Sequence, residues 1–312
     1  MTPQGRRQAM AMTRREFLRD AGILASALGL GASAVPGVAR ALERLAAERP
    51  ALLWLQAQSC SGCSVSLLNA DRPGPAELVT RYFALRFHPT LSAATGPTAL
   101  EALAKAIDAG GYLLAVEGAV PAGMPDACTV GEEPLAEVLD RAARRATAVV
   151  AVGTCASFGG IPAAPPNPTG AVPVRAFLKD RGVSSTVVNV PGCPAHPDWI
   201  VGTAVLALRP AGLRLDDEAR PLAFFARPVH DQCPHFAQYE RQEFARAPGE
   251  DGCLFQLGCQ GVLTHSDCPW RGWNAGVNWC VRGRAPCTGC ARPGFAQNPA
   301  YPFFRLNEAR EA

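Results

Sequence analysis

Most residues of this chain that could bind metal lie in one stretch near its C-terminal end. Seven of the twelve cysteines fall between positions 230 and 290. The candidate ligands in this stretch are His230, Cys233, Cys253, Cys259, Cys268, Cys280, Cys287 and Cys290. No apolar repeat of 3.6 or 2 residues continues for long enough to predict a helix or a strand there. Soft thiolates at short spacings, in glycine-rich loops that let the backbone approach an inorganic core, are typical of iron–sulfur clusters or structural zinc.

Disulfides and zinc remain open as alternative uses of these cysteines. An even number of cysteines could pair, but a chain of 312 residues that is 48% hydrophobic can bury a large core without disulfides. Zinc modules usually bring two short ligand pairs close together, whereas the spacings here are irregular. The pairs Cys60-Ser-Gly-Cys63 and Cys287-Thr-Gly-Cys290 contain glycine, which favours metal over a structural disulfide.

Strands and helices alternate over residues 50–210, and these elements would position the upstream cysteines. Near-continuous apolar runs, typical of parallel strands buried on both faces, occupy residues 51–57, 112–116, 147–152 and 185–190. Apolar residues at helical spacing lie between the runs, at Leu100, Leu103, Ala104 and Ile107, and at Leu135, Val138, Leu139, Ala142 and Ala146. Gly110 would end the first helix. The alternation predicts a doubly wound α/β domain.

Four cysteines and one acid follow these predicted strands. They are Cys60, Cys63, Glu117, Cys155 and Cys193. The carboxyl ends of parallel strands share one edge of the sheet, where open α/β sheets bind ligands. We therefore expect the four thiols to converge at that edge on one further cluster.

The first 40 residues have the features of an export signal. A polar, basic segment contains Arg14-Arg15-Glu16-Phe17-Leu18, an Ala- and Gly-rich run follows, and Ala32-Ser33-Ala34 is a candidate cleavage site. Paired arginines before Phe-Leu predict a twin-arginine signal. The mature protein is then expected in the periplasm or on the outer face of the cytoplasmic membrane, exported with its cofactors already inside.

Charge and hydropathy limit the possible partners. The net charge is only +3, and lysines and arginines are scattered, so no nucleic-acid partner is expected. No apolar run of about 20 residues follows the signal. The mature chain is therefore predicted to lack a membrane span and to reach a membrane only through partners.

The ordered motifs resemble those of the small, electron-transferring subunit of nickel–iron hydrogenases, from residue 51 to about 300. The matching segments are Cys60-Ser-Gly-Cys63-Ser, Val116-Glu-Gly-Ala-Val-Pro121, Val152-Gly-Thr-Cys155-Ala, Pro191-Gly-Cys-Pro-Ala-His-Pro-Asp198, His230-x-x-Cys233, Gly258-Cys259-Gln-Gly261, Cys268-Pro, Trp273-Asn-Ala-Gly-Val-Asn-Trp279 and Pro286-Cys-Thr-Gly-Cys290. The resemblance implies a flavodoxin-like domain over residues 50–210 and a loop-rich iron–sulfur domain over residues 211–312.

Carried over by position, the family pattern implies three clusters. A proximal four-iron cluster, nearest the catalytic metal, would be held by Cys60, Cys63, Cys155 and Cys193. A distal four-iron cluster would be held by His230, Cys233, Cys253 and Cys259, and its neutral imidazole would favour reduction. A medial cluster would be held by Cys268, Cys280, Cys287 and Cys290, with four irons if Cys280 is a ligand and three if it is not.

The implied activity is reversible cleavage of dihydrogen into protons and electrons. The nickel–iron site is expected on a large partner subunit, and this chain would pass electrons through its clusters to a cytochrome or another external acceptor. Glu117 would serve in proton transfer or in contact between the subunits, or would cap a following turn. The alternatives are a hydrogen-sensing small subunit, the cluster subunit of respiratory complex I, and an exported non-enzymatic protein with disulfides.

Some positions depart from the family or stand outside the ligand sets. Ser59 occupies a position where familiar members often have an acid, and Gly62 and Gly160 replace two extra cysteines of oxygen-tolerant members. Activity is therefore expected to fall in air. Cys128 is interpreted as a packing thiol. Four histidines are interpreted as structural or surface groups: His88, His196, His235 and His265.

Overall fold

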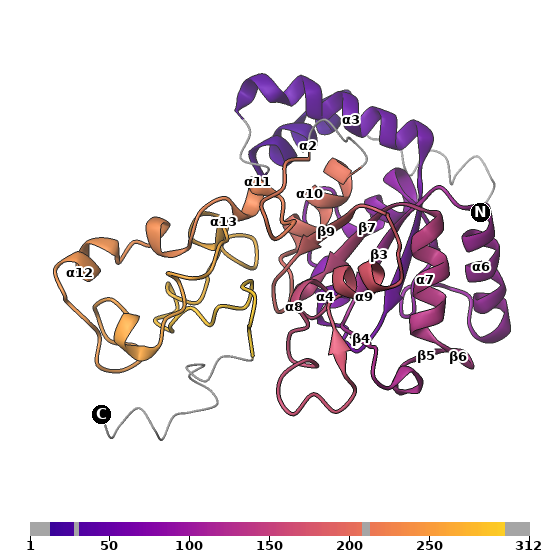
Figure 1. Ribbon diagram of the computed structural model, residues 1–312. Coiled ribbons are helices and arrows are strands. Elements are labelled where there is room, and N and C mark those ends of the chain that lie inside the picture. Colours follow the sequence, from indigo (N-terminus) through magenta and orange to yellow (C-terminus); the bar gives the residue numbers. More distant parts are fainter. Residues whose placement is uncertain (1–12, 28–30, 208–212, 297–312) are drawn as a thin grey trace.

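The computed structural model describes residues 13–27, 31–207 and 213–296, and its largest unit is built on one parallel sheet (Figure 1). The strands are β1 (Ala51–Gln56), β2 (Ala84–Phe87), β3 (Tyr112–Glu117), β7 (Ala146–Val152) and β9 (Val187–Val190). They lie in the order β2-β1-β3-β7-β9, and all neighbouring pairs are parallel. This is the strand order of flavodoxin-like folds, so the predicted α/β class is confirmed.

Helices cover both faces of this sheet because its strands are apolar on both sides. On β1, Leu53 and Leu55 pack into one buried cluster and Trp54 into the other. The first cluster includes α6 (Gly96–Ala109), α7 (Leu135–Arg145) and α9 (Val174–Asp180), and the second includes α4 (Gly62–Leu67), η2 (Leu78–Tyr82) and α10 (Pro197–Ala207). The two helices predicted from apolar spacing are confirmed as α6 and α7, and Gly110 ends α6.

Sequence reasoning missed β2. This strand pairs with β1 alone at the edge of the sheet, and Arg86 in its middle is exposed. An edge strand that is half open to solvent does not carry the continuous apolar run of a central strand. The remaining short elements of the domain are α5 (Pro75–Glu77), β4 (Val120–Pro121), η3 (Pro125–Ala127), β5 (Thr129–Val130), β6 (Glu133–Pro134), α8 (Gly153–Phe158) and β8 (Ala171–Val172).

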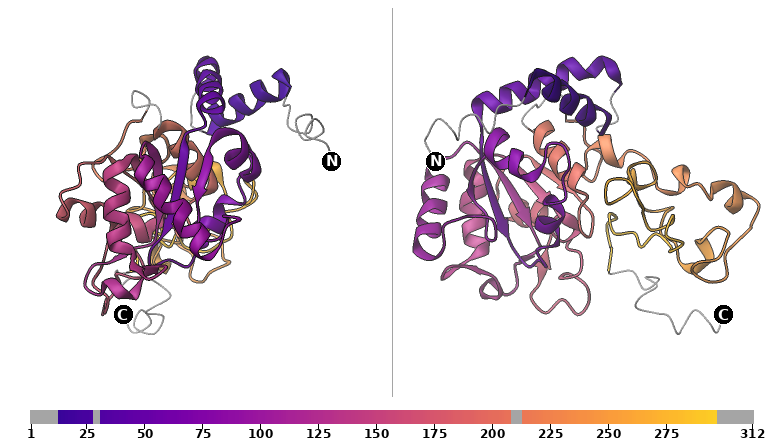
Figure 2. Two further views of the ribbon diagram at one scale, coloured as in Figure 1. Left: turned by 90° about the vertical axis from the view of Figure 1, so that its right-hand side faces the viewer. Right: turned by 180° about the vertical axis from the view of Figure 1, so that it is seen from behind.

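Residues 213–296 form a loop-rich region beside the carboxyl edge of the sheet (Figure 2), and Phe224, Phe225 and Ala291 pack into the second buried cluster of the sheet domain. Its helical turns are α11 (Leu222–Phe225), η5 (His230–Gln232), α12 (Phe236–Glu240), η6 (Phe255–Leu257) and α13 (Cys268–Arg271). Its buried apolar cluster consists of Val229, Ala245, Leu254, Trp279, Val281 and Cys287. The predicted loop-rich C-terminal region is therefore observed.

The N-terminal segment forms two helices that lie against the second buried cluster. Helix α2 (Arg14–Ala27) packs on α3 (Val35–Glu48), and Ala21, Leu24 and Leu42 are buried. The candidate cleavage site coincides with the turn η1 (Ala32–Ala34), and the predicted signal boundary at residue 40 falls inside α3. Residues 1–12 of the predicted signal lie outside the described residues. Twin-arginine export itself stays a prediction.

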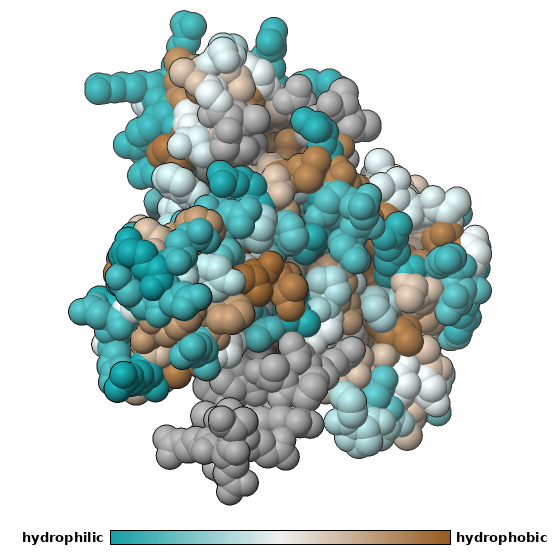
Figure 3. All heavy atoms as spheres, turned by 60° about the vertical axis from the view of Figure 1, so that its left-hand side comes forward, coloured by the Kyte–Doolittle hydropathy of each residue, from teal (hydrophilic) through white to brown (hydrophobic). Residues whose placement is uncertain are grey.

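The surface of the C-terminal region mixes polar side chains with apolar patches, as Figure 3 shows from that side. Leu263, Trp270 and Val277 are among its exposed large apolar side chains. In the described part of the chain, no helix is both long and apolar enough to cross a membrane.

Candidate metal centres

The four upstream cysteines meet at the carboxyl edge of the sheet, as predicted. Cys60 and Cys63 follow β1, Cys155 lies in α8 directly after β7, and Cys193 follows β9. The thiols are close enough to affect one another: Cys155 and Cys193 raise the pKa of Cys63, and Cys60 raises that of Cys155 and Cys193. We call these four residues the proximal set.

Burial opposes ionisation of the proximal thiols. It raises the pKa of Cys63 well above its ordinary value, raises that of Cys155, and brings that of Cys193 to about 11. Ligation requires thiolates, so the negative charge at this edge needs a positive counterpart. Bound iron would supply it.

Two glycines let the backbone come close to the proximal sulfurs. A Cβ on Gly153, where φ is +86°, would lie 2.5 Å from Cys63 Sγ. A Cβ on Gly160, where φ is +52°, would lie 2.9 Å from the backbone N and Cα of Cys155. Both positions therefore exclude a side chain, including the extra cysteine that oxygen-tolerant members carry at the position of Gly160.

Glu117 caps the loop that carries Cys63. Its Oε1 accepts the backbone N–H of Cys63 at 3.0 Å, and its Oε2 accepts the Ser64 hydroxyl at 2.5 Å. The Trp54 indole and the Gln56 amide each donate to Oε2 at 3.2 Å. Glu117 thus caps a loop that precedes it in the chain, whereas the turn that it was expected to cap follows it. Its roles in proton transfer and in subunit contact stay predictions.

His88 extends this polar network toward the surface. Its Nδ1 accepts the backbone N–H of Thr90 at 3.1 Å, so the proton sits on Nε2, 3.2 Å from the Ser64 hydroxyl. Burial lowers the pKa of His88 to about 4, which keeps the ring neutral. Sequence reasoning missed Trp54, Gln56 and Ser64, although Gln56 stands opposite Glu117 in the sheet register and is a polar end to an apolar strand.

The medial set consists of Cys268, Cys280, Cys287 and Cys290. Burial raises the pKa of Cys268 and Cys290 to about 12 and that of Cys287 well above its ordinary value. Cys290 further raises the pKa of Cys268 and Cys287, and Cys280 raises that of Cys287 and Cys290. The structure therefore places Cys280 beside Cys287 and Cys290, two of the three cysteines with which it was predicted to act.

The distal set consists of His230, Cys233, Cys253 and Cys259, which line one cavity together with Gly261. Cys253 and Cys259 raise the pKa of Cys233, after burial, which is the larger cause. Aromatic rings surround the imidazole: the centroids of Phe236 and Tyr239 lie 5.1 and 4.5 Å from that of His230. The cavity thus has three thiols and the imidazoles of His230 and His235 on its walls.

Contacts between cysteines of different sets connect the three sets in series. Cys193, in the proximal set, lies close enough to Cys290, in the medial set, to raise the pKa of its thiol, after burial, which is the larger cause. The backbone N–H of Cys287, also medial, donates to Cys259 Sγ of the distal set at 3.3 Å. The spatial order is therefore proximal, medial, distal.

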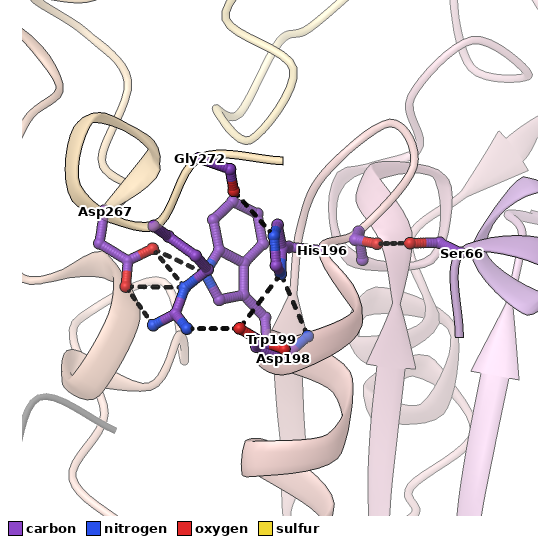
Figure 4. A network of polar contacts seen from close by, with 8 residues as sticks. Ser66, His196, Asp198, Trp199, Asp267 and Gly272 are labelled. Atoms are coloured by element: carbon purple, nitrogen blue, oxygen red, sulfur yellow. Dashed lines mark hydrogen bonds and ion pairs between the residues drawn. The ribbon is translucent and has the colours of Figure 1, made fainter. Parts of the chain in front are cut away.

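A buried polar network joins the C-terminal region to the sheet domain near these sets (Figure 4). His196 Nε2 donates to the Gly272 carbonyl at 2.9 Å, and the Trp199 indole donates to Asp267 at 2.8 Å. Arg271 bridges Asp267 and Asp198, 2.8 Å from the latter. His196 thus contributes to the contact between the two regions, and the network fixes the segment that begins with the medial Cys268.

The described cysteines form no disulfide. All twelve are free, and Cys128 packs in the sheet domain with its thiol directed to the Gln56 carbonyl at 3.8 Å. No three His, Cys, Asp or Glu side chains of the described ranges lie close enough to bind a single metal ion.

Comparison with known proteins identifies the family. Residues 60–207 match the family "NADH ubiquinone oxidoreductase, 20 Kd subunit", and residues 225–303 match the C-terminal family of the NiFe/NiFeSe hydrogenase small subunit. The periplasmic [NiFeSe] hydrogenase small subunit of Desulfomicrobium baculatum is 40% identical over 95% of this chain and 99% of its own length. The chain belongs to the nickel–iron hydrogenase small subunits.

Further relatives agree with the assignment. The periplasmic [NiFe] hydrogenase small subunit 1 of Nitratidesulfovibrio vulgaris is 38% identical and covers 94% of this chain and 93% of its own length. The solved [NiFeSe] hydrogenase of Desulfovibrio vulgaris Hildenborough superposes with a TM-score of 0.79 at 42% identity, over 82% of this chain and 99% of that one. A hydrogenase small subunit works as one part of a heteromeric enzyme and pairs with a large subunit. The hydrogenase-specific match over residues 225–303 argues against the complex I alternative.

Proposed function

We propose that this chain carries electrons between a nickel–iron site on its large partner subunit and an external acceptor through three iron–sulfur clusters. The observation that carries the proposal is the serial contact of the ligand sets, from Cys193 to Cys290 and from Cys287 to Cys259. Iron–sulfur clusters supply one-electron redox chemistry at potentials that the protein tunes. Nothing in this function requires the chain itself to bind dihydrogen.

Each ligand set has the donors that its cluster would need. The proximal set offers four thiols, and the glycines beside it leave room for close approach of an inorganic core. The distal set offers three thiols and the His230 imidazole on one cavity wall. The rings of Phe236 and Tyr239 pack against the His230 imidazole, and the apolar surroundings of a ligand are one of the factors that set a cluster potential.

For the medial set we propose a four-iron cluster with Cys280 as the fourth ligand. Cys280 lies close enough to Cys287 and Cys290 to raise the pKa of both thiols. A thiol on another surface of the region would not be close enough to do so. A fourth thiolate and a fourth iron change the redox couple. We expect a lower medial potential, closer to those of its neighbours, and easier electron transfer in both directions.

We further propose export by the twin-arginine route to the periplasm, where a cytochrome or another redox protein takes electrons at the distal set. Arg14 and Arg15 are exposed on α2, as recognition by an export machinery requires. Two of the most similar relatives carry "periplasmic" in their names. Replacement of both arginines with lysine should leave the precursor in the cytoplasm, and normal export of that variant would refute this route.

The central test is anaerobic purification of the chain with its partner. We expect broad absorption near 400 nm that bleaches on reduction, iron and sulfide equivalent to three clusters, and a co-purifying large subunit that contains nickel. A colourless protein without iron would refute the electron-transfer function. Iron at the level of one or two clusters would show that at least one ligand set is assigned wrongly.

A further inference from the structure

Thr154 occupies the junction of three segments that carry ligands. It stands between Gly153 and the proximal ligand Cys155, in the loop after β7. Its backbone N–H donates to the Gly192 carbonyl at 2.9 Å, and the Gly192 N–H donates back to the Thr154 hydroxyl at 2.8 Å. Two proximal loops, one with Cys155 and one with Cys193, are therefore joined by a reciprocal pair of hydrogen bonds.

The same hydroxyl reaches across to the medial set. Thr154 Oγ1 donates to the carbonyl of Cys290, and the thiol of Cys290 lies within electrostatic reach of the proximal Cys193. Thr154 is buried, with an exposed fraction of 1%, so water does not compete for these bonds. The hydroxyl donates its proton to the Cys290 carbonyl in the C-terminal region and accepts the Gly192 N–H in the sheet domain. A hydrocarbon side chain can form neither hydrogen bond.

We propose that Thr154 is a positioning residue that fixes the medial ligand Cys290 against the proximal loop of Cys193 and so controls electron transfer between the proximal and medial groups. The inference rests on the proposed function. In the step concerned, one electron leaves the reduced proximal group and enters the oxidised medial group; no bond forms or breaks and no proton moves. Because the two groups are held by separate regions, their separation depends on contacts such as this one.

The chain offers matched variants for a test. Thr154→Val keeps the shape of the side chain and removes the hydroxyl, whereas Thr154→Ser keeps the hydroxyl. Thr203→Val is the control, because Thr203 is also fully buried but its hydroxyl has no partner among the described residues. All three should be made in the complex with the large subunit, after the wild-type complex has been shown to contain its clusters. Absence of iron from the wild type would refute the proposed function and leave the position of Thr154 unaddressed.

Two measurements report on position rather than on overall activity. Hydrogen exchange at the Gly192 amide and the magnetic coupling between the reduced proximal and medial clusters should both change in Thr154→Val. The rate of medial reduction after rapid mixing with hydrogen should fall, because electron transfer slows as the separation between the two groups increases. Thr154→Ser and Thr203→Val should match the wild type in all three.

The outcomes separate cleanly. Wild-type coupling and transfer rate in Thr154→Val would overturn the proposal, as would an equal loss in Thr203→Val, which would show a general effect of buried substitutions. If Thr154→Val fails to assemble, Thr154→Ser decides: a transfer rate equal to that of the wild type supports the hydroxyl, and a slower rate overturns it.

Discussion

The sheet domain and the C-terminal region hold their ligands in different ways. In the sheet domain, cysteines stand at the ends of strands that are buried between two large apolar clusters. In residues 213–296 the apolar cluster is small, and four candidate ligands belong to it or pack against it: Cys233, Cys259, Cys268 and Cys287. The comparison indicates that the proximal set lies on a frame with a large apolar core of its own. Metal bound at the medial and distal sets, by contrast, would help to hold the C-terminal region together.

Removal of iron is the strongest test of this difference between the two regions. After anaerobic chelation, we expect amides of residues 213–296 to lose protection from hydrogen exchange, because metal binding there substitutes for a hydrocarbon core. Amides of β1, β3, β7 and β9 should stay protected. Hydrogen exchange followed by mass spectrometry measures both regions at once. Equal protection of both regions after chelation would contradict the distinction.

Truncation of a buried apolar side chain should lower the stability of the sheet domain whether or not iron is present. Leu139 in α7 is fully buried, so Leu139→Ala should lower the free energy of unfolding of that domain by about 2–5 kcal/mol. Leu100 in α6 is 37% exposed, and Leu100→Ala should cost less than about 1 kcal/mol. Chemical denaturation, with and without iron, measures the two differences. A large iron dependence for Leu139→Ala would show that the frame depends on the clusters.

Acid should weaken the sheet domain through His88. Burial lowers its pKa to about 4 in the folded chain, below the ordinary value of 6.5, so protonation favours unfolding. The contribution is constant above pH 6.5 and falls between pH 6.5 and about 4, by about 1.4 kcal/mol per pH unit. His88→Asn, which does not titrate, should remove this part of the pH dependence. Identical pH profiles for the two proteins would contradict the assignment.

Glu117→Gln tests the polar support beneath the proximal set. The substitution keeps the shape but turns one acceptor oxygen into a donor that faces the donors from Cys63 and Ser64, at a cost of about 1–3 kcal/mol in unfolding free energy. Glu137→Gln, at an exposed ion pair with Arg181, should cost about 1 kcal/mol or less. Denaturation measures both.

If the Glu117 variant also keeps wild-type hydrogen–deuterium exchange activity in the complex, Glu117 has no required part in proton transfer.

The smallest expected effect is the loss of a single iron from the medial set when Cys280 is replaced. Cys280→Pro should leave a three-iron cluster, which gives a sharp electron paramagnetic resonance signal near g of about 2 in the oxidised protein, whereas the wild type should be silent. Cys128→Ser, at the packing thiol, should leave the spectrum and the iron content unchanged. A strong stoichiometric signal in anaerobically purified wild type would rule out the four-iron assignment.

Short-range patterns in the chain were sufficient to predict the fold class. Apolar runs and helical spacing predicted β1, β3, β7, β9, α6 and α7, because central parallel strands and amphipathic helices have regular apolar patterns in a sequence. The grouping of the cysteines into three ligand sets is what the order of the family motifs implies, and their ligation of iron stays a prediction. The edge strand β2 could not be predicted in this way, because a strand that is half exposed to solvent does not need a continuous apolar run.

Other features depend on contacts between residues far apart in the chain, and tertiary structure alone decided them. Thr154 meets Cys290, His196 meets Gly272, and Glu117 meets the Cys63 loop, across sequence separations of 136, 76 and 54 residues. The sequence does not show which backbone group a hydroxyl or a carboxylate will bond to, because the partner depends on how the two regions pack together. The fold class could therefore be predicted from the sequence, whereas the residues that position the candidate ligands could be identified only in the folded molecule.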